Sequence, residues 1–326
     1  MKVIKFFAIT AMAAAMITSC SNEDELSQSN YPSDNIIRVT AGVNNAKTRA
    51  EGAGTEMKND FSLTIVNKNA PKYTYTDKVF SKTSGDWACS ETLLWQKSDA
   101  LVDIVAFAPA QTGKFNGVYA NGSIQPITYS VADDQSTKSD NNDLLYYYAK
   151  DFNPGTSLDK GKLNIQFNHA FCMIDINVTL GTEFNKPSIP TTSPIIKVTL
   201  GGTKIAANVN VTNAASVVTA SGEATATDIT TTNGSFTTAA DPEKNAISRF
   251  SCIAIPQTVG ANTFKVSLMT AGKRYEWTSA EPVELKSGYR YTLKLSMGND
   301  VVLLKGGGIT ATPWTEITSD KPLETD

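Results

Sequence analysis

The chain contains one histidine, His169, and this limits the chemistry that its side chains could perform. A single histidine cannot supply a zinc site of the common histidine-rich kinds. It could serve a nucleophile as a base, but it lies between two strand patterns, and the neighbouring serines carry no nucleophile-elbow signature. We therefore expect a structural histidine, hydrogen-bonded at a strand bend, and we predict that the protein is not an enzyme and has no catalytic residues.

Two further patterns could bind ions or phosphate. Gly306 to Gly308 lacks the Lys-Ser/Thr pair and the helix that follow a phosphate-binding loop. Four aspartates could surround calcium, but their spacing matches no known loop, and a solvated acidic loop is the favoured interpretation; these are Asp133, Asp134, Asp140 and Asp143. The sequence thus predicts no metal and no cofactor.

Tyr146 to Tyr148 and Trp95 could form a platform on which a sugar ring stacks. Alternate aromatic residues on strands more often pack in a core and pair across the sheet, so we expect core positions.

Cys20 stands where a signal peptide should end. Lys2 and Lys5 precede an apolar stretch, Phe6 to Ile17, that is too short to span a bilayer. The small residue before Cys20 resembles the lipobox of bacterial lipoproteins, in which this cysteine is acylated; the alternative is an ordinary secretory signal with an accidental cysteine. The acidic run Ser21 to Glu25 resembles the surface-export signal of Bacteroidota lipoproteins, or is a solvated tether.

The other cysteines are Cys89, Cys172 and Cys252. One disulfide and a spare thiol are possible. Because Cys172 and Cys252 lie in apolar strand patterns, we expect buried, unpaired thiols instead.

The composition excludes several classes of protein. The 326 residues carry a net charge of -3, and the pI is near 5.4. This balance offers no basic surface for nucleic acid or anionic lipid. Charged residues make up 19%, below the usual quarter, and helical periodicity is scarce, which is typical of an exported all-β protein.

Many short alternating segments separated by turn signals predict two β-sandwiches. Leu93 to Trp95 and Leu101 to Pro109 are interpreted as two paired strands. In the second segment Val102, Ile104, Ala106 and Ala108 share one face, and Leu101, Val105 and Phe107 share the other. A domain boundary is expected within Asp151 to Gly161, where turn residues gather.

The segment Ile36 to Val43 alternates with period two, which is typical of a half-buried strand. Its predicted apolar face consists of Ile37, Val39, Ala41 and Val43. Arg49 follows in a polar context, between Thr48 and Ala50. We hypothesise that this strand is a removable plug that fills a groove until a protease cuts between Arg49 and Ala50.

Six landmarks in order resemble the fimbrillin-like proteins of Bacteroidota, subunits of pili assembled from lipoprotein precursors. The landmarks are Leu94-Trp95 before Val102 to Pro109, Asp143 to Tyr146, Phe167 to Ala170 before Ile174 to Ile176, Ile255 to Gln257, Gly288 to Leu293, and Ile309 to Trp314. Phe171-Cys172 departs from the pattern and is interpreted as a packing variation.

The resemblance implies two transthyretin-like Greek-key β-sandwiches in tandem. It divides the chain into a signal peptide (1–19), a lipidated propeptide (20–49) with the plug strand at 36–43, and sandwiches at 50–155 and 156–326. The implied partners are other pilin subunits, an Arg-specific surface protease and the outer membrane. The precursor would be a surface lipoprotein and the mature form part of the fimbrium. The donor strand would be C-terminal, either Val301 to Leu304 or Ile309 to Trp314.

Two alternatives stay open from the sequence. The first is a surface lipoprotein that never polymerises and binds a glycan or host ligand. The second, ranked last, is a hydrolase that uses His169.

Overall fold

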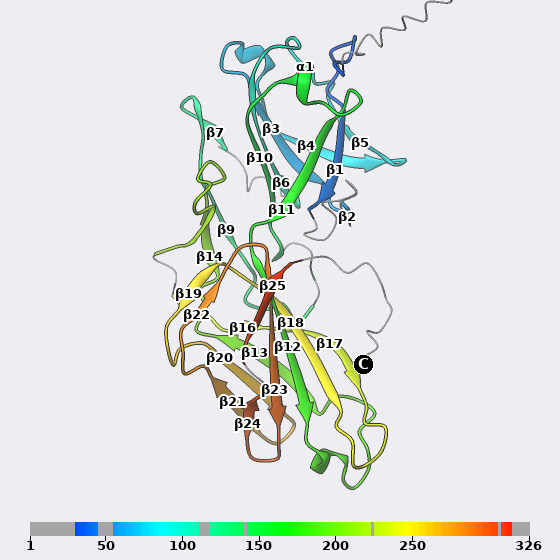
Figure 1. The fold of residues 1–326 in the computed structure, drawn as a ribbon, viewed down its shortest axis with the longest axis vertical. Helices are drawn as coiled ribbons and strands as arrows, with labels where there is room; N and C mark the ends of the chain where they lie inside the picture. The colour runs from blue at the N-terminus through cyan, green and yellow to red at the C-terminus, as the bar shows by residue number, and fades with distance from the viewer. Residues whose placement is uncertain are drawn as a thin grey trace, which may run out of the picture.

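The computed structural model describes residues 30–44, 55–110, 118–137, 139, 142–222, 225–305 and 308–314 (Figure 1). Within these ranges the chain is nearly all β, as predicted, and its two halves lie along the long axis of the molecule. The helical segments are short: α1 (Pro154–Ser157) and the 3-10 turns η1 (Pro71–Tyr73) and η3 (Thr182–Asn185). No described helix is long and apolar enough to cross a membrane.

The first sheet contains most strands of the N-terminal half. Its described strands, in spatial order, are β11 (Leu163–His169), β10 (Leu145–Phe152), β6 (Val102–Ala108), β3 (Phe61–Val66), β4 (Tyr75–Thr83), β5 (Asp86–Cys89), β1 (Val39–Val43) and β2 (Thr55–Glu56). Because β1 also pairs with β11, the first sheet closes into a ring.

A second and a third sheet form most of the C-terminal half. The second sheet has the order β17 (Thr232–Thr237), β18 (Ile247–Ala254), β12 (Cys172–Leu180), β23 (Tyr289–Met297) and β24 (Val302–Leu304), and β25 (Thr310–Pro313) also pairs with β23. The third sheet has the order β16 (Ile229–Thr230), β13 (Ile195–Gly201), β20 (Lys265–Thr270) and β21 (Arg274–Thr278).

Three small sheets complete the described strands. They are β15 (Val218–Ala220) with β14 (Ala206–Val209) and β9 (Ile127–Ser130), β19 (Gln257–Val259) with β22 (Val283–Leu285), and β7 (Tyr119–Ala120) with β8 (Ser123–Ile124).

The apolar side chains gather in two cores. The smaller core lies inside the ring of the first sheet and includes Phe61, Ile104 and Ile165. The larger core lies between the second and third sheets and includes Ile176 and Val266. The chain enters the larger half at β9, returns to the first sheet in β10 and β11, and passes into the larger half again where β12 begins. Both β11 and β12 alternate between buried and more exposed positions.

Strand β6 contributes to both cores. Val102, Ile104, Ala106 and Ala108 belong to the smaller core, whereas Val105 and Phe107 belong to the larger one. The predicted division into two faces is therefore confirmed within β6, and the first sheet is buried on both faces there. Leu101, predicted on the face of Val105 and Phe107, precedes β6 and is exposed.

The predicted pairing of Leu93–Trp95 with the strand that follows is wrong. Strand β6 pairs with β3 and β10, whereas Leu94 forms an isolated bridge with Ile36. The backbone of Leu93 accepts a hydrogen bond from the N–H of Ile37 at 2.9 Å. Ile36 and Ile37 therefore pair with Leu93 and Leu94, in place of the strand that follows in the sequence.

Contacts cross the predicted domain boundary at Asp151 to Gly161. Strand β9 precedes the boundary but pairs with β14, and β11 follows it but pairs with β10 and β1. The division into domains at 50–155 and 156–326 stays a prediction.

Asp77 occupies a bulge in β4. The register shifts opposite Thr64, whose hydroxyl accepts the N–H of Asp77 at 2.9 Å, and Asp77 has a φ of 50°. One carboxylate oxygen of Asp77 is buried without a partner among the described residues. Burial raises the pKa of this carboxyl, and the hydroxyls of Thr64 and Ser62 offset only part of that shift.

We predict that Asp77→Asn stabilises the protein at neutral pH. A carboxyl with a raised pKa in the folded state contributes most when protonated and loses that contribution as pH rises. Asparagine tolerates the same positive φ. Because the carboxyl is partly exposed, we expect the Tm at pH 7 to rise by only about 1–2 °C. Thermal melts from pH 3 to 8 should show the difference shrinking toward acid; an equal difference at every pH would contradict this explanation.

Candidate functional site: the groove filled by the N-terminal strand

Strand β1 closes the ring of the first sheet. On one side it pairs in parallel with β11 along its whole length, from Val39 opposite Leu163 to Val43 opposite Phe167. On the other side Val39 pairs with Trp87 of β5, and the end of β1 pairs with β2. Figure 1 shows β1 and β11 side by side. If β1 were absent, β11 and β5 would become the open edges of a groove.

Hydrogen bonds extend this pairing beyond both ends of β1. The N–H of Trp95 donates to the carbonyl of Asn35 at 2.8 Å. The N–H of Leu163 donates to the carbonyl of Arg38 at 2.8 Å, and that of Asn44 donates to the carbonyl of Phe167 at 2.7 Å. The segment held in the groove therefore spans residues 35–44.

The side chains of this segment alternate as the sequence predicts. Ile37, Val39 and Val43 are 6%, 4% and 3% exposed and belong to the smaller core, and Ala41 is half-buried beside it. Arg38, Thr40 and Asn44 are exposed. The wall of the groove on β11 is formed by Leu163, Ile165 and Phe167, all fully buried. The groove thus holds a strand by its apolar side chains as well as by its backbone.

Polar contacts hold both ends of β1 at the surface. Arg38 pairs with Asp34, and this guanidinium, together with the N–H of Ile36, lowers the pKa of the Asp34 carboxyl to about 2. At the other end the amide of Asn44 donates to Asn168 at 2.9 Å. Both contacts are exposed, so they align the strand more than they stabilise it.

Cys20, Arg49 and Ala50 lie outside the described residues, as does the acidic run after Cys20. The strands on either side of Arg49 and Ala50 in the sequence, β1 and β2, are described. Val43 at the end of β1 pairs with Thr55 of β2. Arg49 therefore belongs to the connection between two strands that pair with each other.

Both candidate donor strands lie at one edge of the second sheet. Strands β24 and β25 pair antiparallel with β23, Leu304 opposite Leu295 and Thr310 opposite Thr292. These two pairs are six residues apart in the C-terminal segment, 304 and 310, but only three residues apart in β23, 295 and 292. Gly306 to Gly308 falls in this interval. The two strands form one interrupted edge strand.

Trp314, which follows β25, packs against His169. The Trp314 indole stacks on the imidazole, with ring centroids 3.8 Å apart and an interplanar angle of 14°. His169 Nδ1 lies 2.8 Å from a carboxylate oxygen of Asp143. The N–H of Trp314 donates to the carbonyl of Gly288 at 2.7 Å. His169 is hydrogen-bonded at the end of β11, as predicted, and its partners among the described residues do not include a nucleophile.

The other candidate residues are dispersed. Trp95 is buried and stacks on Phe152 at 6.1 Å, Tyr147 packs on the smaller core, and Tyr146 and Tyr148 pack on the larger one. The three remaining cysteines are free, with Cys172 and Cys252 buried, as expected; burial raises the pKa of both thiols.

The predicted acidic loop does not gather into a site within the described range. The carboxylate of Asp143 faces His169, and the backbone of Asp134 forms an isolated β-bridge with Thr230. Asp140 lies outside the described residues. The described residues contain no group of three His, Cys, Asp or Glu side chains that could hold a metal ion.

Two contacts could not be predicted from the sequence: the pairing of the groove wall on β11 with β1, and the packing of His169 against Asp143 and Trp314. The alternation of Leu163, Ile165 and Phe167 predicts a half-buried strand but gives no signal for its neighbour. Asp143 stands out in the sequence as a member of an acidic run and as the start of one landmark, but nothing in the sequence pairs it with His169.

A sequence model of the fimbrillin-like family matches residues 48–314, which is 267 of the 326 residues. No curated protein matches the chain significantly. Among solved structures, a candidate cell adhesion protein from Bacteroides ovatus has a TM-score of 0.59 and 16% identity over 86% of this chain and 98% of that one.

Two further structures have the same fold. A candidate cell adhesion protein from Bacteroides uniformis has a TM-score of 0.56 and 14% identity, covering 87% of this chain and 100% of that one. A fimbrial protein from Bacteroides vulgatus has a TM-score of 0.54 and 16% identity, covering 86% and 99%. With the family match spanning from the segment after β1 to Trp314, the chain belongs to the fimbrillin-like family.

Proposed function

We propose that this protein is a structural subunit of a surface pilus that mediates adhesion. Membership of the fimbrillin-like family supports a pilus subunit. The precursor would be an outer-membrane lipoprotein anchored through Cys20 and exported to the cell surface. Asn30 lies ten residues after Cys20, so the connection spans at most about 33–36 Å, which would keep the precursor close to its membrane.

The observation that carries the proposal is the double pairing of β1 inside the ring. Burial of Ile37, Val39 and Val43 contributes about 1.5–3 kcal/mol for each side chain, or roughly 5–9 kcal/mol together. This is comparable with the stability of a whole domain, about 5–15 kcal/mol. A subunit that loses β1 would therefore be strongly driven to accept another strand by strand addition.

Proteolysis would open the groove. In this proposal an Arg-specific protease cuts between Arg49 and Ala50 and releases residues 20–49, including the plug strand. Strand β2 would remain with the mature chain at the rim of the groove. The mature chain would consist of two transthyretin-like sandwiches, at 50–155 and 156–326.

The donor would come from the C-terminal segment of a neighbour, β24 or β25. Both strands lie at the edge of the second sheet, so their departure would leave the order of β18, β12 and β23 intact. A C-terminal strand entering an N-terminal groove makes a heterologous contact that does not close, so subunits would add into a fibre.

We predict that Arg49→Ala blocks maturation. The variant should keep β1, remain acylated at Cys20 and stay monomeric, because its groove is filled. Denaturing gels without heating and mass spectrometry of the surface protein would measure both effects. Lys47→Ala is the matched control, since an Arg-specific protease should ignore it. Polymer ladders from Arg49→Ala would rule out the plug mechanism.

We predict that Ile37→Ala weakens the precursor. Removing a buried isoleucine side chain should lower its free energy of unfolding by about 2–5 kcal/mol. The exposed neighbour Thr40→Ala should change it by less than about 0.5 kcal/mol. Denaturant titration of the uncleaved proteins would measure the difference. Equal midpoints for the two variants would show that β1 contributes nothing through its apolar face.

We predict that Trp314→Ala loosens β25. Loss of the stacked indole should cost about 3 kcal/mol, which corresponds to roughly 100-fold faster amide exchange in residues 310–314. Thr312→Ala, an exposed change on the same strand, should leave the exchange nearly unaltered. Hydrogen exchange read by mass spectrometry would test this, and unchanged protection in the Trp314 variant would refute a holding role for the stack.

A further inference from the structure

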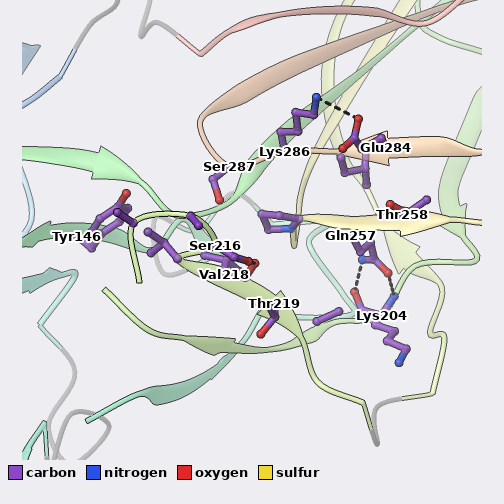
Figure 2. A pocket seen from close by; sticks show the side chains of 16 residues that line it. Tyr146, Lys204, Ser216, Val218, Thr219, Gln257, Thr258, Glu284, Lys286 and Ser287 are labelled. Carbon is purple, nitrogen blue, oxygen red and sulfur yellow. Dashed lines mark hydrogen bonds and ion pairs between the residues drawn. The ribbon is translucent and has the colours of Figure 1, made fainter. Parts of the chain in front are cut away.

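A polar cleft of about 710 Å³ opens in the upper part of the larger half. It is bounded by the β14–β15 hairpin, by the β19–β22 pair with the residues that follow it, and by Tyr146 of β10. Figure 2 shows Tyr146 and Ser287 on one side and Gln257 and Lys204 on the other. The volume falls in the range of small-molecule sites, about 300–1,000 Å³.

One wall of the cleft is fixed by its own hydrogen bonds. The Gln257 amide accepts the N–H of Lys204 at 2.9 Å and donates to the carbonyls of Lys204 and Ile255 at 3.0 and 3.2 Å. The Lys204 ammonium donates to the carbonyls of Ser221 and Gly222 at 3.0 and 3.3 Å. This wall is pre-organised, and the Lys204 cation already has partners.

Strand β15, which also lines the cleft, presents backbone groups that β14 does not bond. The N–H of Asn210 donates to Val217 and the N–H of Ser221 donates to Ala206, at 2.7 and 2.9 Å. Because antiparallel ladders alternate, Val218 and Ala220 direct their N–H and C=O groups away from β14. Strand β15 is the edge of its sheet, and the only described partner of these groups is the Ser216 hydroxyl, 3.5 Å from the Val218 carbonyl.

Hydroxyl groups on side chains add further hydrogen-bond donors and acceptors to the cleft. Ser287, Thr258, Thr219 and Tyr146 line the cleft, and within the described chain none of their hydroxyls has a hydrogen-bond partner. Each hydroxyl can donate and accept. Small apolar surfaces from Val217 and Pro256 lie among them.

The charges in the cleft narrow the class of ligand. Lys286 pairs with Glu284 at 3.0 Å, and Lys204 is satisfied by carbonyls. A phosphate or a carboxylate would find no unpaired cation among these side chains. A lipid tail would leave the hydroxyl groups buried without hydrogen-bond partners. A ligand with many hydroxyls and apolar C–H faces matches both the donors and acceptors and the small apolar patches.

We propose that this cleft binds a neutral oligosaccharide. The inference rests on the proposed surface location of the subunit, but not on strand exchange. A peptide strand fits less well, because the free edge of β15 is only three residues long and offers a short ladder.

The test uses the purified full-length protein in detergent and a set of neutral oligosaccharides: lacto-N-tetraose, N-acetyllactosamine, mannotriose, xylotriose and maltotriose. Titration calorimetry should detect at least one with a micromolar to millimolar Kd. Thr258→Trp should weaken that binding by about tenfold or more, because the indole fills the cleft. Thr278→Trp, an exposed strand threonine outside the cleft, should leave it unchanged.

Ser287→Ala supplies a second variant that adds no bulk and should weaken binding by a few-fold. Absence of binding by every sugar, or equal binding by the wild type and Thr258→Trp, would overturn the proposal. If Thr258→Trp fails to polymerise and the wild type binds no sugar, the cleft contacts a neighbouring subunit instead. That result would also overturn the proposal. Polymer ladders report strand exchange separately, so the two proposals can fail independently.

Discussion

The backbone pairing of β1 is the constraint on which the rest of the first sheet depends. A ring of strands has no free edges, whereas an open sheet exposes two rows of unpaired N–H and C=O groups. Strand β1 supplies both missing ladders, with β11 on one side and with β5 and β2 on the other. Its apolar face completes the smaller core at the same place. The same five residues therefore decide whether the sheet is closed and whether its core is covered.

Local patterns in the sequence were enough to predict the class of fold and the faces of individual strands. Apolar residues alternate with period two along β11, β12 and β1 because each strand is buried mainly on one side. The dipeptide Asn121-Gly122 is typical of a hairpin turn, and both residues have positive φ in the β7–β8 turn. The sequence also predicts the apolar face of the segment that pairs with β11, whereas its role as a removable plug stays a proposal.

The identity of each strand's neighbour could not be predicted. Alternation records which side of a strand is buried but says nothing about the partner, so the parallel match of β1 with β11 left no signal. Because neighbours in sequence usually pair, the sequence favours pairing of Leu93–Trp95 with the next strand, yet Leu94 forms its bridge with Ile36. The cleft beside β15 was missed because isolated serines and threonines in a Thr-rich chain form no pattern until the fold brings them together.

The parallel match of β1 with β11 also fixes the order of events when the chain first folds. Thr40 and Asn164 are 124 residues apart, and pairs so distant in sequence close late because the loop between them must first be ordered. A chain is made from its N-terminus, so β1 exists well before its partner strand. Every new chain therefore passes through a stage in which the ring is open and β1 is free. In that stage the first sheet has the same two open edges, on β11 and β5, that it would have without β1.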